Sequence, residues 1–253
     1  MKSKVFSHLI DVKDRFGAGY LLLIDPDRAE MREIDRIAEV AASSGVDAFL
    51  VGTSILTDGS VDGVIGRIKA VSHLPVILFP GASHHLSPLA DAVLFLSLIS
   101  GRNPQFLIGE QVKAAPFIRR YGLEAIPTGY MLIEGGSYTS VEFMSGTRPI
   151  PRDKIDIACA HALAGELLGM KCIYLEAGSG AREPVPNEMI CGVKSWVSIP
   201  LIVGGGIRSP DVAREKVESG ADFIVTGNVF EGKFDPDLLS EFAEAIHHIP
   251  FNR

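Results

Sequence analysis

Three apolar runs in the last third of the chain stop abruptly at glycine-rich sequences. Residues 172–180 read CIYLEAGSG, residues 199–208 read IPLIVGGGIR, and residues 223–228 read FIVTGN. Glycines that follow a strand let backbone N–H groups approach an anion closely, because no side chain stands in the way. A single GGG sequence is more typical of a tight turn, but three such sequences on consecutive predicted strands favour a phosphate site.

A carboxylate follows directly on one of these runs. Glu176 lies at the end of the apolar stretch CIYLE, beside the predicted phosphate site, where it could take a proton from the hydroxyl of a bound ligand. A structural hydrogen bond to a neighbouring loop is the alternative role. Tyr174 points to the same side of the strand as Glu176, so it either contacts substrate or fills the interior of the fold.

Oxygen ligands follow the first two apolar runs of the chain. Asp25 follows the first run, in the sequence LIDPDR, and Thr53 and Ser54 follow the second run, in LVGTS. Mg²⁺ binds one or two protein oxygens and leaves its other positions to water and substrate phosphates, so Asp25 is a candidate magnesium ligand. Capping of a helix or an ion pair with Arg28 explains Asp25 equally well when it is taken alone.

Other potential metal ligands lack a suitable pattern. Cys159, Cys172 and Cys191 show no CxxC or Cys/His spacing, and we expect buried thiols rather than a metal site or disulfides. His84 and His85 have no carboxylate or cysteine at ligand spacing, which favours exposed loop histidines.

The composition restricts the class of protein. The net charge of −7 argues against a nucleic-acid partner, since binding to a phosphate backbone needs clustered Lys and Arg. The longest apolar runs, such as AVLFLSLI, are much shorter than a membrane span, and no signal peptide is visible at the N-terminus. We therefore expect a cytoplasmic protein without an integral membrane segment.

The elements that would position these residues alternate regularly along the chain. Short apolar runs precede amphipathic stretches at residues 29–44, 60–72, 104–121, 153–168, 186–196, 209–219 and 235–247, and a brief polar turn follows the run PVILFP. Eight such βα units in 253 residues predict an α/β fold, a closed (β/α)₈ TIM barrel, with a doubly wound open sheet as the alternative. No linker or charge block divides the chain, so we expect residues 1–253 to form a single domain.

One connection is longer than usual for a βα loop. Residues 135–152, GGSYTSVEFMSGTRPIPR, are rich in Gly, Ser, Thr and Pro. A barrel has its active site at the carboxyl ends of its strands, where this loop lies, and we expect the loop to cover that site.

The motifs LIDPDR, LISGRNPQFLIGEQ, PTGYMLIE, YLEAGSGA, LIVGGGIRS and VTGNVFE resemble those of the geranylgeranylglyceryl phosphate synthase family over nearly the whole chain. The resemblance implies Mg²⁺-dependent transfer of a long prenyl group, with geranylgeranyl as the expected one, from its diphosphate to the primary hydroxyl of sn-glycerol 1-phosphate. Diphosphate is released, and the product carries the first ether bond of an archaeal-type lipid.

The resemblance also implies roles for individual residues. It places Mg²⁺ on Asp25 and Ser54 and makes Glu176 the base. It places glycerol phosphate on a set of strand-end residues: Tyr174, Leu175, Glu176, Ala177, Gly178, Ser179, Gly180, Gly205, Gly206, Gly227 and Asn228. Two positions depart from the pattern, because Leu23 stands where some relatives have a phosphate-binding Lys and Asn228 replaces a common Thr or Ser. Leu23 indicates the larger branch of the family.

The prenyl chain requires an apolar groove roughly 20 Å or more in length. Residues 94–112 and 129–143 are the candidate walls, with Phe79, Phe106, Tyr130 and Phe143 as possible lining groups or as ordinary core residues. The larger branch of the family forms homodimers or homohexamers, and Phe106 is a candidate interface anchor.

Two other functions share the phosphate-site signals. One is a phosphate-binding barrel enzyme of another type, an isomerase or a lyase, with acid and base residues on its first and fifth strands. The other is a sensor that binds a phosphorylated ligand without turning it over.

Overall fold

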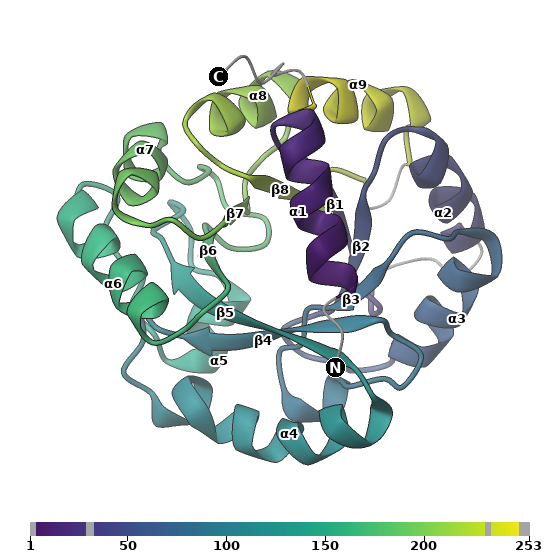
Figure 1. Cartoon of the computed structure of the whole chain (residues 1–253), viewed down its shortest axis with the longest axis horizontal. Helices are drawn as coiled ribbons and strands as arrows, with labels where there is room; N and C mark the ends of the chain where they lie inside the picture. The colour runs from purple at the N-terminus through teal and green to yellow at the C-terminus, as the bar shows by residue number, and fades with distance from the viewer. Residues whose placement is uncertain (1–3, 29–32, 231–233, 248–253) are drawn as a thin grey trace.

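The eight strands of the protein close into a parallel barrel (Figure 1). The structure, a computed structural model, describes residues 4–28, 33–230 and 234–247. The strands follow one another around the barrel in chain order, and β8 pairs with β1. They are β1 (Gly19–Ile24), β2 (Ala48–Val51), β3 (Val76–Leu78), β4 (Ala92–Leu98), β5 (Glu124–Leu132), β6 (Cys172–Glu176), β7 (Leu201–Gly204) and β8 (Phe223–Thr226).

Helices surround the barrel and connect most consecutive strands. The α-helices are α1 (Lys4–Phe16), α2 (Ile34–Ser43), α3 (Val61–Val71), α4 (Glu110–Tyr121), α5 (Ser140–Ser145), α6 (Ile155–Leu167), α7 (Asn187–Trp196), α8 (Pro210–Glu218) and α9 (Pro236–Ile246). Short 3₁₀ turns form η1 (Ser83–His85) and η3 (Asn228–Phe230), and a π-helical turn forms η2 (Gln105–Gly109). The predicted (β/α)₈ barrel is confirmed, and the open doubly wound sheet is excluded by the β1–β8 pairing.

Side-chain alternation along the strands divides the core into two clusters. Leu21, Leu50 and Ile202 belong to the cluster that fills the barrel, whereas Leu22, Phe49 and other outward-facing residues pack against the helices. Because both faces of each strand are buried, the strands read as continuous apolar runs in the sequence. This is the property that made them recognisable.

Helix α1 was not expected from the sequence. It lies across one end of the barrel in Figure 1, where Val5 and Leu9 join the interior cluster. The backbone N–H groups of Val5 and Phe6 donate to the carboxylate of Glu124, at 2.7 and 3.0 Å, and so attach the helix to the start of β5. This helix closes the amino-terminal end of the barrel, which leaves the carboxyl ends of the strands as the side from which a ligand can enter.

The third βα unit has no α-helix. Only the 3₁₀ turn η1 stands between β3 and β4, in agreement with the polar turn expected there. Strand β3 pairs with β4 at only two positions, Ile77 with Ala92 and Leu78 with Val93, so β4 continues beyond the end of its neighbour. Gln111 on α4 donates its side-chain amide to the carbonyl of Leu96, which β3 does not reach. The barrel wall is therefore open between β3 and the part of β4 that follows Val93.

Two of the three cysteines are buried. Cys159 and Cys172 are buried as expected, but the prediction for Cys191 is wrong, because it lies on the exposed side of α7.

Within the described ranges, every helix is too short or too polar to span a bilayer.

Candidate active site

A cavity of about 1110 Å³ opens at the carboxyl ends of the strands. All eight strand ends or the loops after them contribute to its wall, and the 135–152 connection adds the short helix α5. Tyr138, Ser140 and Phe143 of that connection line the cavity. The expectation that the long loop covers the site is confirmed.

Glycines with left-handed backbone conformations form one side of the cavity. The φ angles of Gly178, Gly180, Gly205 and Gly206 are +102°, +72°, +83° and +72°. A Cβ atom at Gly205 would stand 2.4 Å from the Glu176 carboxylate and 2.7 Å from the Gly178 nitrogen. The β6 and β7 loops thus meet at a distance that only glycine permits, and the meeting brings their backbone N–H groups to one place.

Asn228 joins the third glycine-rich loop to the first. Its side-chain oxygen accepts hydrogen bonds from the Ser179 hydroxyl at 3.0 Å and from the Gly180 N–H at 3.2 Å. Asn228 therefore fixes the β6 loop from the β8 side. It also uses a backbone donor that would otherwise face the cavity.

Glu176 lies at the floor of this glycine-lined region. Its side chain is buried, and its Oε1 accepts the Gly178 N–H at 2.7 Å. Burial raises the pKa of Glu176 to about 7, and the Gly178 hydrogen bond opposes the increase. A carboxylate with this pKa accepts a proton near neutral pH more readily than an ordinary Glu does, which suits a general base.

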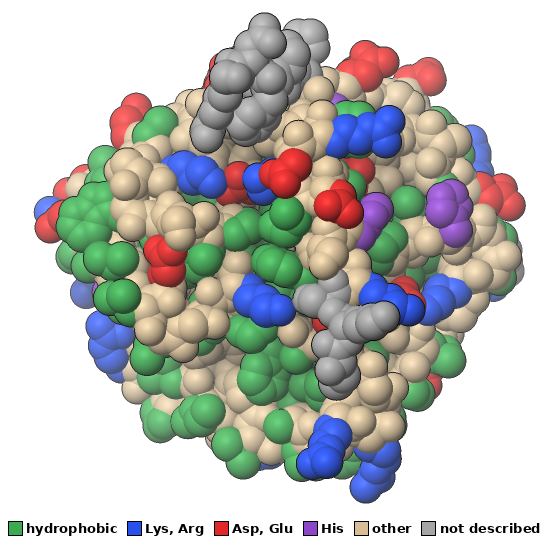
Figure 2. All heavy atoms as spheres, viewed as in Figure 1, with side chains coloured by type: hydrophobic (Ala, Val, Ile, Leu, Met, Phe, Trp, Pro, Cys, Tyr) green, Lys and Arg blue, Asp and Glu red, His purple; other side chains and the backbone are tan. Residues whose placement is uncertain are grey.

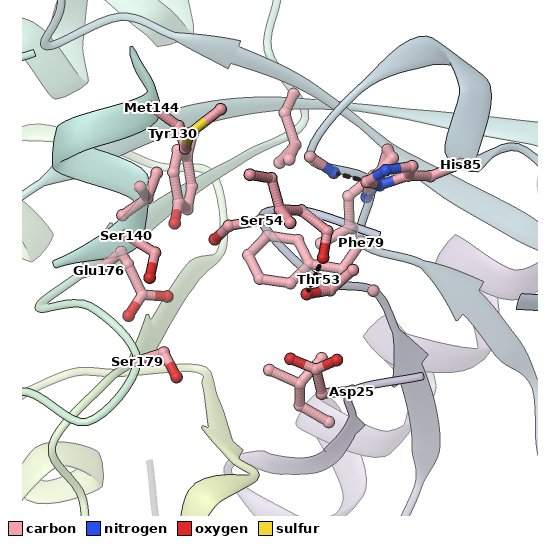
Figure 3. A pocket seen from close by; sticks show the side chains of 18 of the residues that line it. Asp25, Thr53, Ser54, Phe79, His85, Tyr130, Ser140, Met144, Glu176 and Ser179 are labelled. Carbon is pink, nitrogen blue, oxygen red and sulfur yellow. Dashed lines mark hydrogen bonds between the residues drawn. The ribbon is translucent and has the colours of Figure 1, made fainter. Parts of the chain in front are cut away.

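Asp25 lies across the cavity from Glu176, and Ser54 lies between Glu176 and Phe79 (Figure 3). The Asp25 carboxylate accepts the Asp27 N–H at 2.9 Å and pairs with Arg28 at 3.8 Å, so the alternative ion pair is also present. Thr53 donates its hydroxyl to the carbonyl of Ile55 at 3.0 Å. Ser54 also lines the cavity.

Asp25 is a carboxylate in an open cavity, the type of ligand that Mg²⁺ takes from a protein. No group of three or more His, Cys, Asp and Glu able to hold a metal occurs among the described residues. One carboxylate is too few to enclose a cation, but Mg²⁺ commonly keeps water and phosphate oxygens as its remaining ligands.

Most of the residues selected from the sequence line this one cavity. They are Asp25, Ser54, Tyr174, Glu176, Ser179, Gly180, Gly205, Gly206, Gly227 and Asn228. Leu175 and Ala177 direct their side chains into the core between strands and helices, and Gly178 stands behind the lining as a donor to Glu176. Leu23 also lines the cavity, so an apolar side chain occupies the place of the lysine found in some relatives.

Sequence reasoning missed one cavity residue and misjudged another. Arg208 lies two residues after the GGG sequence, and its guanidinium donates to the carbonyls of Ala181 and Arg182 at 2.6 and 3.1 Å, which holds the β6–α7 loop beside the glycines. An arginine close behind a glycine-rich strand end was the available signal. The prediction of an exposed loop is right for His84 but wrong for His85, which is 2% exposed.

The burial of His85 has a local cause. Its Nδ1 accepts the Gly81 N–H at 3.3 Å, and its ring packs under η1 against His84. Burial lowers the pKa of His85 to about 4, so the ring is neutral at physiological pH. This histidine stabilises the loop after β3, next to Thr53 and Ser54, whose carbonyls lie close to Gly81.

The cavity continues as an apolar groove through the opening in the barrel wall. Its lining between β3, β4 and α4 includes Leu94, Phe95, Leu96, Phe106, Ala114 and Ile118. Phe79, Tyr130 and Phe143, the other lining groups considered from the sequence, also face the cavity. Phe106 packs against the interior cluster, so it does not serve as an outer interface anchor; Ile108 and Val112 are the exposed side chains nearby.

Comparisons with known proteins agree on one family. The model of the PcrB family matches residues 11–246. A geranylgeranylglyceryl phosphate synthase from Spirosoma linguale is 49% identical over 238 residues, which cover 94% of this chain and 95% of the relative.

Solved structures extend the comparison. The (S)-3-O-geranylgeranylglyceryl phosphate synthase of Thermoplasma acidophilum, in complex with its substrate sn-glycerol-1-phosphate, superimposes with a TM-score of 0.90 at 36% identity and covers 98% of this chain and 100% of that one. The tryptophan synthase alpha subunit of Legionella pneumophila reaches a TM-score of 0.60 at 16% identity, covering 98% of this chain and 100% of its own. At that identity the likeness shows only a common fold.

Proposed function

The chain belongs to the PcrB family, and on that premise we propose that it is a prenyltransferase that forms geranylgeranylglyceryl phosphate. It joins a prenyl diphosphate to the primary hydroxyl of sn-glycerol 1-phosphate and releases diphosphate. The observation that carries this proposal is one cavity that combines glycine-rich loops, a buried carboxylate with a raised pKa, a second carboxylate across from it and an apolar groove.

Glycerol phosphate binds on the side of β6, β7 and β8. The backbone N–H groups of the glycine-rich loops hold the phosphate, since Gly205 and Gly206 line the cavity and carry no side chain that would keep an anion from the main chain. When phosphate binds, the Gly180 N–H donates to the phosphate in place of the Asn228 side-chain oxygen. The glycerol then extends toward Glu176, which removes the proton from the primary hydroxyl as the new C–O bond forms.

The prenyl diphosphate binds on the opposite side. Asp25 and Ser54 would hold Mg²⁺ there, and the ion would neutralise the charge that develops on the leaving diphosphate. The two residues orient the diphosphate so that the allylic carbon faces the hydroxyl across the cavity. Positioning both reactants in line supplies several kcal/mol of the barrier.

The prenyl chain occupies the groove between β3 and α4. This space is free because no α-helix lies between β3 and β4. The apolar side chains that line the groove replace the water around the hydrocarbon chain. A cavity of about 1110 Å³ is at the upper end of ordinary ligand pockets, in agreement with a long substrate. The proposed product carries the first ether bond of an archaeal-type lipid.

The test is incubation of the purified chain with labelled sn-glycerol 1-phosphate, MgCl₂ and geranyl, farnesyl or geranylgeranyl diphosphate. We expect a labelled ether with the longest donor and a loss of activity with EDTA that added Mg²⁺ restores. Absence of transfer with every donor, together with retained binding of glycerol phosphate, would instead identify a sensor.

The two enantiomers of glycerol phosphate supply a sharper control. With phosphate and base fixed, the sn-3 form must direct its secondary hydroxyl to where the sn-1 form has hydrogen, which leaves polar groups unpaired. We expect sn-glycerol 1-phosphate to be preferred by at least about tenfold in kcat/KM. Equal values would contradict the proposed placement of phosphate and Glu176.

A further inference from the structure

Three aromatic rings form a continuous layer under the reaction space. Phe79 follows β3, Tyr130 lies on β5 and Tyr174 on β6. The Phe79 and Tyr174 rings stack, with centroids 5.2 Å apart and planes at 11°. Tyr130 stands edge-on to both rings, at 5.3 Å from Tyr174 and 5.8 Å from Phe79. We call these three residues the aromatic triad.

Phe79 connects the two halves of the site. Its backbone lies against Gly52, the residue before Thr53 and Ser54, because a Cβ atom at Gly52 would overlap the Phe79 carbonyl. Its ring stacks on Tyr174, two residues before Glu176 on the same strand. Figure 3 shows Ser54 between Glu176 and Phe79, with Asp25 across the cavity from Glu176. All three triad residues line the same cavity as Glu176, Ser54 and Asp25, so the reacting carbon passes close to them.

The triad carries no charge of its own. Burial raises the pKa of Tyr130 and Tyr174 well above the ordinary value, and the nearby Glu176 carboxylate raises both further. Both phenols are therefore neutral at any pH at which the enzyme works. All three uncharged rings line the cavity, and the negative face of an aromatic quadrupole attracts a cation.

We propose that the aromatic triad, and Phe79 above all, stabilises the positive charge on the allylic carbon during transfer. This inference rests on the proposed function. The bond between the allylic carbon and the diphosphate oxygen breaks, and its electron pair leaves with the diphosphate. The glycerol hydroxyl oxygen supplies the pair for the new C–O bond, and its proton goes to Glu176. Between these two events the allyl group is cationic, and a ring face attracts such a charge electrostatically.

Core packing alone accounts less well for the arrangement. Phe223 also belongs to the interior cluster, but it is 1% exposed and lies near the end closed by α1, next to Gly19. Phe79 is only partly buried and lines the cavity. Phe223 is therefore a matched control: the same residue type in the same barrel, without access to the reactants.

The experiment replaces Phe79 by its mono-, di- and trifluorinated analogues through nonsense suppression. Fluorine withdraws electron density from the ring face with little change in shape, so the rate constant for a single turnover should fall stepwise, to about a tenth with three fluorines. KM for geranylgeranyl diphosphate should change less than twofold, since the ground state carries no cation. The same series at Phe223 should leave the rate constant unchanged.

A flat series at Phe79, or an equal decline at Phe223, would overturn the inference while leaving the proposed function intact. Failure of the unmodified enzyme to transfer a prenyl group would overturn the proposed function instead. A second arm uses 2-fluorogeranylgeranyl diphosphate, whose fluorine destabilises an allylic cation. A rate within threefold of the natural donor would show that little positive charge develops, which would also overturn the inference.

Discussion

At the residue scale, Glu176 is the group on which the chemistry depends most directly. Glu176→Gln keeps the shape of the side chain but removes the proton acceptor, so turnover should fall by roughly 10² or more while the affinity for glycerol phosphate stays close to normal. In the native enzyme, kcat/KM should rise with pH through about 7, where the carboxyl loses its proton. Initial rates and calorimetric binding measure the two effects, and a loss in turnover below threefold would remove Glu176 from the role of base.

The same carboxyl couples stability to pH. Its pKa is raised from 4.5 to about 7 on folding, so the folded state binds the proton more tightly than the unfolded state. The free energy of unfolding should therefore decrease as the pH rises from about 4.5 to about 7, by about 3 kcal/mol in total. Urea denaturation across this range measures the change. Glu176→Gln should show a shallower decline, and parallel curves for both proteins would contradict the assigned pKa.

Asp25 belongs to the other half of the site. Asp25→Asn removes a negative charge from the proposed magnesium ligands, so affinity for Mg²⁺ and for prenyl diphosphate should fall at least tenfold. The affinity for glycerol phosphate should stay within twofold of native, because that ligand binds across the cavity. Asp58→Asn, on the exposed loop before α3, is the control. An equal loss of both affinities would show that the site is not divided in this way.

At the element scale, the groove depends on the absence of an α-helix between β3 and β4, where the structure has only the 3₁₀ turn η1. Ala114 on α4 is 7% exposed and lines the groove, so Ala114→Phe should fill it. KM for geranylgeranyl diphosphate should rise about tenfold or more, because part of the chain loses its apolar surroundings. Geranyl diphosphate, which does not extend that far, should be used as well as by the native enzyme. Equal inhibition with both donors would contradict this course of the groove.

Most elements could be predicted because their signals are local. Near-continuous apolar runs identified the strands, and glycines before them marked the turns: Gly45, Gly122, Gly169 and Gly220 all have positive φ. Helix α1 could not be recognised in the same way. Its apolar residues Val5, Leu9 and Val12 form a narrow stripe, and they become core residues only once the closed barrel offers an end to cover.

The site was predicted unevenly for a related reason. Glycines and carboxylates at strand ends are visible in the sequence, since a parallel barrel brings all strand ends to one side. The burial of His85 and the π-helical turn η2 depend on packing against α4 and on the short β3, which no local pattern reports. The resemblance to a family supplied the substrates, which physical patterns alone left open.

At the scale of the whole molecule, the described surface leaves several large apolar side chains exposed. Figure 2 shows hydrophobic side chains spread over the left and lower parts of one face, where α6 and α4 lie in Figure 1. Leu167 and Leu168 at the end of α6 are 80% and 75% exposed, and Phe117 on α4 is 42% exposed. Exposed apolar surface of this kind is more typical of a subunit than of a monomer.

We therefore expect a homodimer or a homohexamer, and sedimentation at micromolar concentration should give a mass at least twice the chain mass of 27.2 kDa. Leu167→Asp combined with Leu168→Asp should shift the protein toward the monomer, because two carboxylates in an interface core would lose their hydration. Asp62→Lys, on α3 at the other side of the barrel, should leave the mass unchanged. A native mass near that of one chain would contradict the assembly, and an unchanged mass in the double variant would assign the interface to another face.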